Sequence, residues 1–303
     1  MLPLVYHPNY SCPFPDDHRF VMSKFVRLYE HLRTKGIAKT NVYRPKIASM
    51  ADLTTTHCQQ YLTDMFSDNL DSKVWRRVGL PWSQGLIDRT QTAPNGTLLT
   101  ARIALHKGLA CHLAGGTHHA HYDFGSGFCM VNDLAYTAKT LVDEGAVSKV
   151  LIFDLDVHQG DGTASILAND PRVFTCSIHC EKNFPFRKFD SDLDIGLDVG
   201  LQDDAYLRVV LDTLAQLLDD VKPDLVLYDA GVDVWQEDVL GRLDISWQGI
   251  KRRDTEVINY CLQRNIPVAT VIGGGYDKDH QRLAERHAIV VESAFELFTK
   301  HRL

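Results

Sequence analysis

The sequence predicts an α/β protein with a mainly parallel central sheet, because strand-like and helix-like segments alternate along its second half. Three short apolar runs, at residues 150–153, 224–228 and 267–272, have the continuous character of strands that are buried on both faces. Two longer segments, 203–221 and 248–264, have the spacing of amphipathic helices. Strands that are connected through helices run parallel to one another, so the fold class follows from the order of these segments.

The ends of the helices are marked by residues that cannot continue them easily. Lys222-Pro223 ends the first helix, since proline lacks the amide hydrogen that the next helical turn needs. Asn265 ends the second helix, and the strand that follows runs directly into Gly273-Gly274-Gly275-Tyr276. The apolar stripe of the first helix consists of Leu207, Val210, Leu211, Leu214, Leu217 and Leu218.

The composition predicts a soluble globular protein of one domain over residues 1–303. Hydrophobic residues make up 45% of the 303 positions and charged residues 23%, and no repeat or linker interrupts the chain. A formal net charge of −7 argues against direct binding to nucleic acid or to an anionic membrane. We find no signal peptide and no apolar run of transmembrane length. Seven dispersed cysteines are typical of reduced thiols, so we expect a cytoplasmic protein.

The segment Asp-Leu-Asp-Val-His-Gln-Gly-Asp follows the first strand directly and predicts a metal site. If the extended conformation continues, Asp154, Asp156 and His158 point to one side of the sheet. Carboxylate oxygens and imidazole nitrogens are ligands of divalent metal ions. The alternative is that these are turn and capping residues that end the strand. That alternative explains one acidic residue well, but it explains three acidic residues and a histidine poorly.

Asp233 is the candidate for a third metal ligand, because it follows the next predicted strand. The carboxyl ends of parallel strands meet at one edge of the sheet, where ligands bind in such folds. Three protein ligands with a position left for water are the mark of a catalytic zinc site. Asp156, His158 and Asp233 would be those ligands. The alternative for Asp233 is the N-cap of a helix.

Two further groups bring acid–base chemistry to this edge. His118 and His119 follow a helix-like segment and two glycines, and two imidazoles beside a metal-bound water can serve as general base and general acid. Asp154 and Asp161 would each orient one of the imidazoles. The run of three glycines forms a flexible hinge that presents Tyr276, whose hydroxyl can donate to a developing oxyanion. The alternative for Tyr276 is a tyrosine of the core.

The chain resembles the zinc-dependent histone deacetylase superfamily, which also contains acetylpolyamine amidohydrolases and acetoin-utilisation proteins. The motifs Gly-Gly-Thr-His-His-Ala at residues 115–120 and Asp-Leu-Asp-Val-His-Gln-Gly-Asp at 154–161 are specific to that superfamily. The similarity extends over nearly the whole chain, from Phe14-Pro15-Asp16-Asp17-His18-Arg19 to Gly273-Gly274-Gly275-Tyr276, and Val78-Gly-Leu-Pro-Trp-Ser is similar to its class IV-like and bacterial branch. The resemblance implies an arginase-like fold, with an open and mainly parallel sheet flanked by helices.

The resemblance also implies two metal ions and assigns roles to the reactive side chains. Zn²⁺ would be the catalytic ion, with Fe²⁺ as the alternative in the cell, and K⁺ would be structural. His119 would act as the general base for the attacking water, His118 would assist electrostatically and Tyr276 would polarise the amide carbonyl. The zinc ligands would be Asp156, His158 and Asp233. The potassium ligands would be Asp154, Ser177 and the main chain of Asp156, His158 and Ile178.

A substrate pocket follows from the same resemblance. Phe128, next to Gly127, and Phe184 match two aromatic residues that enclose the alkyl chain of an acylated lysine. Arg19 matches an arginine that lines an internal channel at the foot of the pocket. Leu240 replaces a gatekeeping glutamate of polyamine-selective relatives, so we expect an acyl-lysine substrate in preference to a cationic polyamine.

We therefore expect a zinc-dependent amidohydrolase that removes an acetyl or other acyl group from the Nε of lysine in a protein or peptide. The alternative substrate is a small molecule such as an acetylpolyamine or an acetoin-related compound. A binuclear manganese ureohydrolase shares the fold but needs ligands that bridge two metals. A non-enzymatic acyl-ligand sensor would have lost a metal ligand, a histidine or Tyr276, and all of these are present. Acyl-chain length and oligomeric state are left open, and Asp16 and Asp17 are the acidic residues nearest to the expected pocket mouth.

Overall fold

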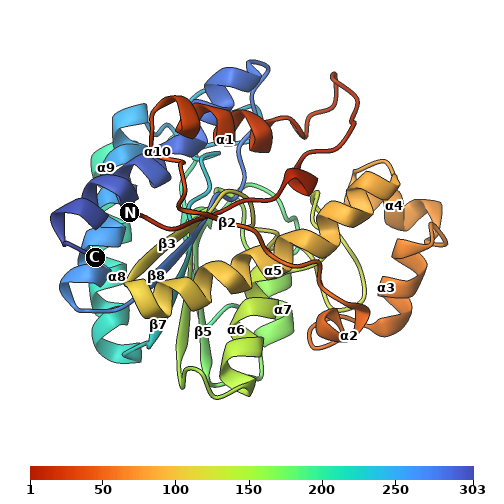
Figure 1. Ribbon diagram of the computed structural model, residues 1–303, viewed down its shortest axis with the longest axis horizontal. Coiled ribbons are helices and arrows are strands. Elements are labelled where there is room, and N and C mark those ends of the chain that lie inside the picture. The colour runs from red at the N-terminus through yellow and green to blue at the C-terminus, as the bar shows by residue number, and fades with distance from the viewer.

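Eight strands form one open sheet in the computed structural model, which describes residues 1–303 (Figure 1). The strands are β1 (Leu4–Val5), β2 (Val42–Tyr43), β3 (Leu109–His112), β4 (Val150–Asp154), β5 (Val173–Cys180), β6 (Leu193–Leu197), β7 (Leu225–Asp229) and β8 (Val268–Val271). Their order across the sheet is β2-β1-β3-β8-β7-β4-β5-β6, and every neighbouring pair is parallel. The predicted α/β class with a mainly parallel sheet is therefore confirmed.

Two series of helices flank the sheet, and within each series neighbouring helices pack side by side. One series consists of α8 (Asp203–Val221), α9 (Trp247–Gln263), α10 (His280–Lys300) and α1 (Lys24–Thr34), and the other of α5 (Gln84–Lys107), α6 (Asp133–Asp143) and α7 (Asp161–Leu167). The short helices are η1 (Pro8–Tyr10), α2 (Met50–Leu53), α3 (Gln59–Phe66) and α4 (Ser72–Val78), and α3 and α4 lie on the side of the molecule away from α8 and α9 (Figure 1). None of the helices combines the length and the apolar character needed to cross a membrane.

The predicted segments of the second half of the chain agree with the structure to within one residue at each end. The predicted helices 203–221 and 248–264 are α8 and α9, and the three predicted strands are β4, β7 and β8. Lys222 and Asn265, which were expected to stop the two helices, adopt the left-handed backbone conformation with φ values of 51° and 57°. Asparagine tolerates this conformation well, whereas a lysine adopts it at a cost.

Two local expectations were wrong. The extended conformation does not continue past Asp154, because β4 ends there and residues 156–158 form bends. Side-chain carboxylates cause the bends: Asp154 Oδ1 accepts from the amide of Asp156 at 3.0 Å, and Asp156 Oδ1 accepts from the amide of His158 at 2.9 Å. The histidine pair is also preceded by the short strand β3 rather than directly by a helix.

The core between sheet and helices contains a fully buried arginine that fixes the loop after β7. Arg253 of α9 pairs with Asp254 at 2.8 Å and donates to the carbonyl oxygens of Gly231 and Ala230 at 2.7 and 3.2 Å. Asp254 in turn accepts from the hydroxyl of Tyr228 on β7. Because no water reaches this group, every polar atom that loses its partner here carries the full cost of desolvation.

We predict that Arg253→Met lowers the free energy of unfolding by about 3–5 kcal/mol, because it leaves the buried Asp254 carboxylate without its counter-ion and two carbonyl groups without the donor that Arg253 provides. Chemical denaturation of purified protein measures the effect. The neighbouring exposed Arg252, which pairs with Asp204 on the surface, provides the control. Arg252→Met should change the free energy of unfolding by less than about 1 kcal/mol. Equal effects of the two substitutions would contradict the structural role of Arg253.

Candidate active site

The candidate site lies where four neighbouring strands end. β3, β8, β7 and β4 are adjacent in the sheet, and their carboxyl ends lead into the loops that carry the predicted residues. The order of the strands in space differs from their order in the chain, so residues more than a hundred positions apart come together. The strand ends and loops supply His118 and His119 after β3, Asp154, Asp156 and His158 at and after β4, Asp229 and Asp233 at and after β7, and Tyr276 after β8.

The three predicted zinc ligands lie together in the interior. His158 Nδ1 is 2.9 Å from Asp156 Oδ1 and 3.2 Å from Asp233 Oδ2, and all three side chains are buried. The other carboxylate oxygens are held by main-chain donors: Asp156 Oδ2 accepts from the amide of Gly274 at 2.7 Å, and Asp233 Oδ1 from that of Val157 at 2.9 Å. Each carboxylate therefore turns its remaining oxygen toward the same imidazole nitrogen.

The donor set fits a divalent metal ion such as zinc. One atom from each of the three side chains lies within 4.8 Å of the others, which suits a single ion at about 2 Å from each. Asp233 Oδ2 contacts His158 but makes no hydrogen bond of acceptable geometry, although it is buried. A buried carboxylate oxygen without a hydrogen bond is costly unless a cation binds it. The residues present thus provide what the implied ion requires.

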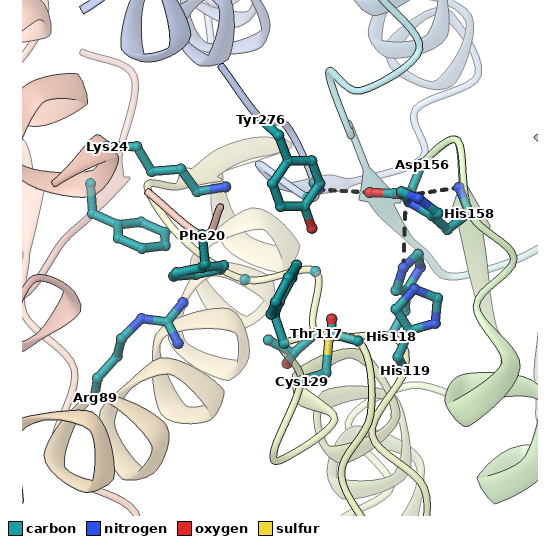
Figure 2. A pocket seen from close by; sticks show the side chains of 17 residues that line it. Phe20, Lys24, Arg89, Thr117, His118, His119, Cys129, Asp156, His158 and Tyr276 are labelled. Carbon is teal, nitrogen blue, oxygen red and sulfur yellow. Dashed lines mark hydrogen bonds and ion pairs between the residues drawn. The ribbon is translucent and has the colours of Figure 1, made fainter. Parts of the chain in front are cut away.

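The two histidines of the pair are each bound to one carboxylate. His118 Nδ1 lies 2.7 Å from Asp154 Oδ2, and His119 Nδ1 lies 2.6 Å from Asp161 Oδ1. The two rings are stacked obliquely with 4.1 Å between their centres, and Figure 2 shows both beside Asp156 and His158. Asp161 also contacts His121 through its second oxygen at 3.0 Å, so its position is fixed from two sides. The predicted pairing of histidines and aspartates is present in the structure.

Electrostatics distinguish the two histidines. Burial alone would lower the pKa of His118, but the carboxylates of Asp154 and Asp156 outweigh it and hold the pKa well above its usual value. Burial and the charge on His118 lower the pKa of His119 to about 4. In the metal-free protein, His118 is therefore an imidazolium at neutral pH and His119 a neutral imidazole, the form that can accept a proton.

Tyr276 presents its hydroxyl to the same space. The side chain is buried, and its ring lies 6.5 Å from that of His158 and 5.8 Å from that of Phe128. Figure 2 shows the hydroxyl pointing into the cavity toward the histidine pair. Burial and the nearby carboxylate of Asp233 raise the pKa of Tyr276 well above its usual value, so the phenol stays protonated and able to donate.

The glycines of these loops are required by close approach, and at Gly274 this replaces the flexible hinge that the sequence predicted. A Cβ atom on Gly274 would lie 2.5 Å from Asp156 Oδ2, and one on Gly116 would lie 2.6 Å from the Cα of Gly273. Gly116 also has a φ value of 85°, which a larger residue adopts at a cost. Backbone thus packs directly against the carboxylates and excludes water from them.

An outer pocket of about 330 Å³ leads from the surface to His119, His158 and Tyr276. Of the residues that the resemblance placed in the substrate pocket, five line it: Gly127, Phe128, Phe184, Leu240 and Arg19. The predicted position of Arg19 was wrong, because its exposed side chain lines this outer pocket and not an internal channel. Arg19 lies in the loop before α1, where the next residue, Phe20, turns inward instead.

An inner cavity continues behind the site and contains two buried cations that sequence reasoning missed. Lys24 and Arg89 line this cavity together with Phe20, Phe25 and Tyr276 (Figure 2). Lys24 Nζ lies 5.4 Å from the centres of both phenylalanine rings, and Arg89 stacks on the same rings. Neither cation has a carboxylate within 4.0 Å. Burial and the charge on Arg89 lower the pKa of Lys24 to about 8.

A second group of acidic and histidine side chains adjoins the first. His118, Asp154 and Asp229 also place one atom each within 4.8 Å of one another. Asp229 is fully buried, and neither of its carboxylate oxygens has a hydrogen-bond partner. Burial and the charge on Asp154 raise the pKa of Asp229 well above its usual value. The sequence predicted no role for Asp229, and a protonated carboxyl is the form that this environment favours.

The residues expected to bind potassium lie on neighbouring strands. Strand register places Ser177 of β5 opposite Asp154 of β4, with Ile178 next in the chain. The Ser177 hydroxyl lies 3.0 Å from His179 Nδ1. The potassium site remains a prediction.

Two buried carboxylates support the loops without touching the reactive space. Asp133 accepts from the amides of Gly116 and Thr117 at 3.1 and 2.7 Å and so fixes the loop of the histidine pair. Asp238 accepts from the amide of Tyr276 at 2.7 Å and from Arg286 at 3.1 Å. A single sequence gives no signal for either role, because an aspartate at a helix start or in a loop has the default interpretation of a cap or a turn residue.

Comparison with known proteins agrees with this geometry. The family model of the histone deacetylase domain matches residues 18–293 of this chain. The chain belongs to the histone deacetylase family. It is 49% identical to an uncharacterized protein of Picosynechococcus sp. over 98% of this chain and 99% of that protein. It is 30% identical to histone deacetylase 2 of Arabidopsis thaliana over 92% of this chain and 76% of the relative, and 30% identical to histone deacetylase 8 of Xenopus laevis over 78% of each.

The fold is that of the same family. The crystal structure of the HDA15 HD domain superposes with a TM-score of 0.80 over 99% of this chain and 88% of that one, at 17% identity. At that identity the superposition is evidence for the fold alone. The fold is arginase-like, as predicted. Membership of the histone deacetylase family supports a hydrolase that acts on acetyl-amide bonds.

We predict that Asp233→Ala lowers bound zinc well below one equivalent, because it removes one of three protein ligands and leaves the other two unable to close the site. Elemental analysis of protein dialysed against trace zinc measures the stoichiometry. Asp204→Ala, on the exposed face of α8, is the control and should keep the full complement. Full occupancy in Asp233→Ala would contradict the assignment of the ligands.

Proposed function

We propose that this protein is a zinc-dependent deacetylase that removes an acetyl group from the Nε of lysine in a protein or peptide, with residues 1–303 as one catalytic domain. The observation that carries the proposal is the meeting of two carboxylates, one imidazole, a histidine pair and a buried phenol in one space. Family membership supports the hydrolysis of an acetyl amide, and the distances support a metal-assisted route to it.

The chain's own residues divide the work of hydrolysis. Zn²⁺ held by Asp156, His158 and Asp233 would polarise the amide carbonyl and make a bound water easier to deprotonate. Neutral His119 takes a proton from the attacking water and later returns one to the leaving amine. Its Nδ1 is engaged with Asp161, so Nε2 is the nitrogen that accepts the proton.

Charge that develops on the carbonyl oxygen needs stabilisation from the protein as well. Tyr276 keeps its proton and aims its hydroxyl into the reactive space, so it donates to that oxygen. His118, bound to Asp154 through Nδ1, assists electrostatically from a ring centre that lies 4.1 Å from that of His119. Protonation of His119 raises the positive charge around the site. The transfer of this proton to the leaving amine is therefore favourable.

The pocket walls favour an alkyl chain that leads to the amide. The Phe184 ring meets that of His119 edge to face at 4.8 Å, and the Phe128 ring lies 5.8 Å from that of Tyr276. Leu240 adds apolar surface at the mouth of the pocket. A lysine side chain buries its methylene groups between such walls and delivers only its acylated nitrogen to the polar end.

The inner cavity offers a place for the carboxylate product. Lys24 and Arg89 lie across the cavity from the histidine pair (Figure 2), and both lack a protein counter-ion. Acetate released at the site carries one negative charge, which these two cations attract in a region of low dielectric constant.

The second candidate is a binuclear metal hydrolase, and one observation favours it. His118, Asp154 and Asp229 form a second buried group that adjoins the zinc ligands, with His118 Nε2 at 3.8 Å from Asp156 Oδ1. Two equivalents of bound divalent metal per chain would favour this candidate, whereas one equivalent of divalent metal supports the deacetylase. A small acylated amine remains the alternative substrate within the deacetylase proposal.

The reaction class is tested by acetate release from an Nε-acetyl-lysine peptide. Purified protein should release acetate, lose that activity after treatment with a chelator and regain it when Zn²⁺ is added back. Activity that survives complete removal of metal would overturn the proposed mechanism.

We predict that Tyr276→Phe keeps the fold and the bound metal but lowers kcat by about a hundred- to a thousandfold, because the oxyanion loses one preorganised donor. Steady-state kinetics and elemental analysis of the same sample measure both properties. Tyr43→Phe, on the exposed edge strand β2, is the matched control and should leave kcat unchanged. Turnover near that of the wild type in well-folded Tyr276→Phe would remove Tyr276 from the mechanism.

A further inference from the structure

The mouth of the outer pocket is positively charged, although the chain as a whole is negative. Arg19, Arg76 and Arg77 line this pocket, and no aspartate or glutamate does. We call these three residues the basic rim. The chain carries 39 acidic and 32 basic side chains, so a pocket lining with three arginines and no acidic residue differs from the overall charge balance. Asp16, one of the acids expected near the mouth, lines a separate pocket instead.

The charge of the basic rim is not neutralised within the protein. None of its three guanidinium groups lies within 4.0 Å of a carboxylate, and all three side chains are exposed. Arg102 is also exposed and Arg172 partly exposed, but each pairs with carboxylates at 2.8 Å or less. The field of the rim therefore acts on whatever enters the pocket.

The rim is held at a fixed position relative to the reactive groups. The Arg77 guanidinium stacks on the ring of Phe124 at 3.8 Å, and the Arg77 carbonyl accepts from the amide of Gly127 at 3.3 Å. The next carbonyl, that of Val78, accepts from the amide of Phe128 at 2.8 Å. The end of α4, with Arg76 and Arg77, is thus tied through its backbone to the aromatic wall of the pocket.

The position of Arg76 and Arg77 in the last turn of α4 has a second consequence. Positive side chains near a helix C-terminus interact favourably with its dipole. This accounts for two basic residues on α4. It does not account for their meeting with Arg19, which comes from a different part of the chain, at the opening that leads to His119 and Tyr276.

We propose that the basic rim binds a negatively charged group next to the acylated amine, so that the preferred substrates are anionic acyl-amines. This inference rests on the proposed function and narrows its substrate class. The anion is a carboxylate, from either of two sources: acidic residues that flank an acetyl-lysine in a peptide, or the free carboxylate of a small acylated amino acid. Cationic substrates such as acetylpolyamines or lysine-rich peptides are disfavoured, because the rim repels them.

The test compares acetyl-lysine peptides that differ only in the flanking residues, which are Asp, Gln or Lys. An exposed ion pair changes affinity by up to about fivefold, so contacts with two or three arginines should lower KM for the Asp peptide about tenfold relative to the Lys peptide. We expect kcat to differ little, and the preference to decline at high salt because the charges are exposed.

A second arm identifies the source of the carboxylate. Nα-blocked Nε-acetyl-lysine with a free carboxylate is compared with its primary amide. A preference for the free acid in this pair alone indicates a small-molecule substrate, and a preference in the peptide series alone indicates an acidic peptide. Either result supports the inference.

Variants connect the preference to the rim. Arg76→Gln with Arg77→Gln should remove most of the preference for the Asp peptide, and Arg19→Gln should reduce it. Arg102→Gln, a substitution of an exposed arginine on α5, should leave the preference as in the wild type.

Binding is measured as well, by fluorescence anisotropy of the labelled peptides, so that the result does not depend on turnover. No acetate release from any substrate would count against the proposed function, and anisotropy would still decide the inference. Tighter binding of the Lys peptide overturns it, and so does equal affinity in both comparisons, that of the Asp and Lys peptides and that of the free acid and its amide. An Asp preference that survives in the Arg76→Gln, Arg77→Gln protein also overturns it.

Discussion

The structure depends on the neutralisation of four carboxylates that are buried at one edge of the sheet. Asp154 and Asp156 come from the end of β4, and Asp229 and Asp233 from the end of β7, its neighbour. Like charges at such distances cannot all be ionised without compensation in a dry interior. Burial raises the pKa of Asp154, Asp229 and Asp233, because ionising these carboxyl groups in the interior costs free energy. A divalent cation and the imidazolium of His118 are the compensation that the geometry offers.

The scaffold is arranged to meet this constraint. Parallel strands bring the acidic loops to one edge, and main-chain amides of Val157 and Gly274 hold one oxygen of each metal-binding carboxylate. Glycines allow backbone to pass against the carboxylates where any Cβ would collide with them. The buried Arg253 holds the carbonyls of the loop after β7, so Asp233 is positioned by the core itself. The same pre-organisation that makes the site costly for folding makes it ready for a metal ion and a substrate.

The fold and the reactive residues were predictable because they leave short local signals. Apolar runs and helical stripes set the bounds of α8, α9, β4, β7 and β8 to within one residue, and the motifs around His118 and Asp156 identified the residues that meet in space. What the sequence did not indicate depends on tertiary contact. Lys and Arg are by default surface residues, so the burial of Lys24 and Arg89 against Phe20 and Phe25 carries no sequence signal. The location of Arg19 depends on how one loop turns before α1, which no local pattern determines.

The central claim is that one metal ion, bound by Asp156, His158 and Asp233, neutralises this edge and activates the site. The most direct measurement is a crystal structure of the zinc-loaded protein with anomalous diffraction at the zinc edge. The account predicts a single anomalous peak between His158 Nδ1 and the two carboxylates, at about 2.0–2.2 Å from each ligand atom. A pair of peaks about 3.5–4 Å apart, or a single peak among His118, Asp154 and Asp229, would contradict it.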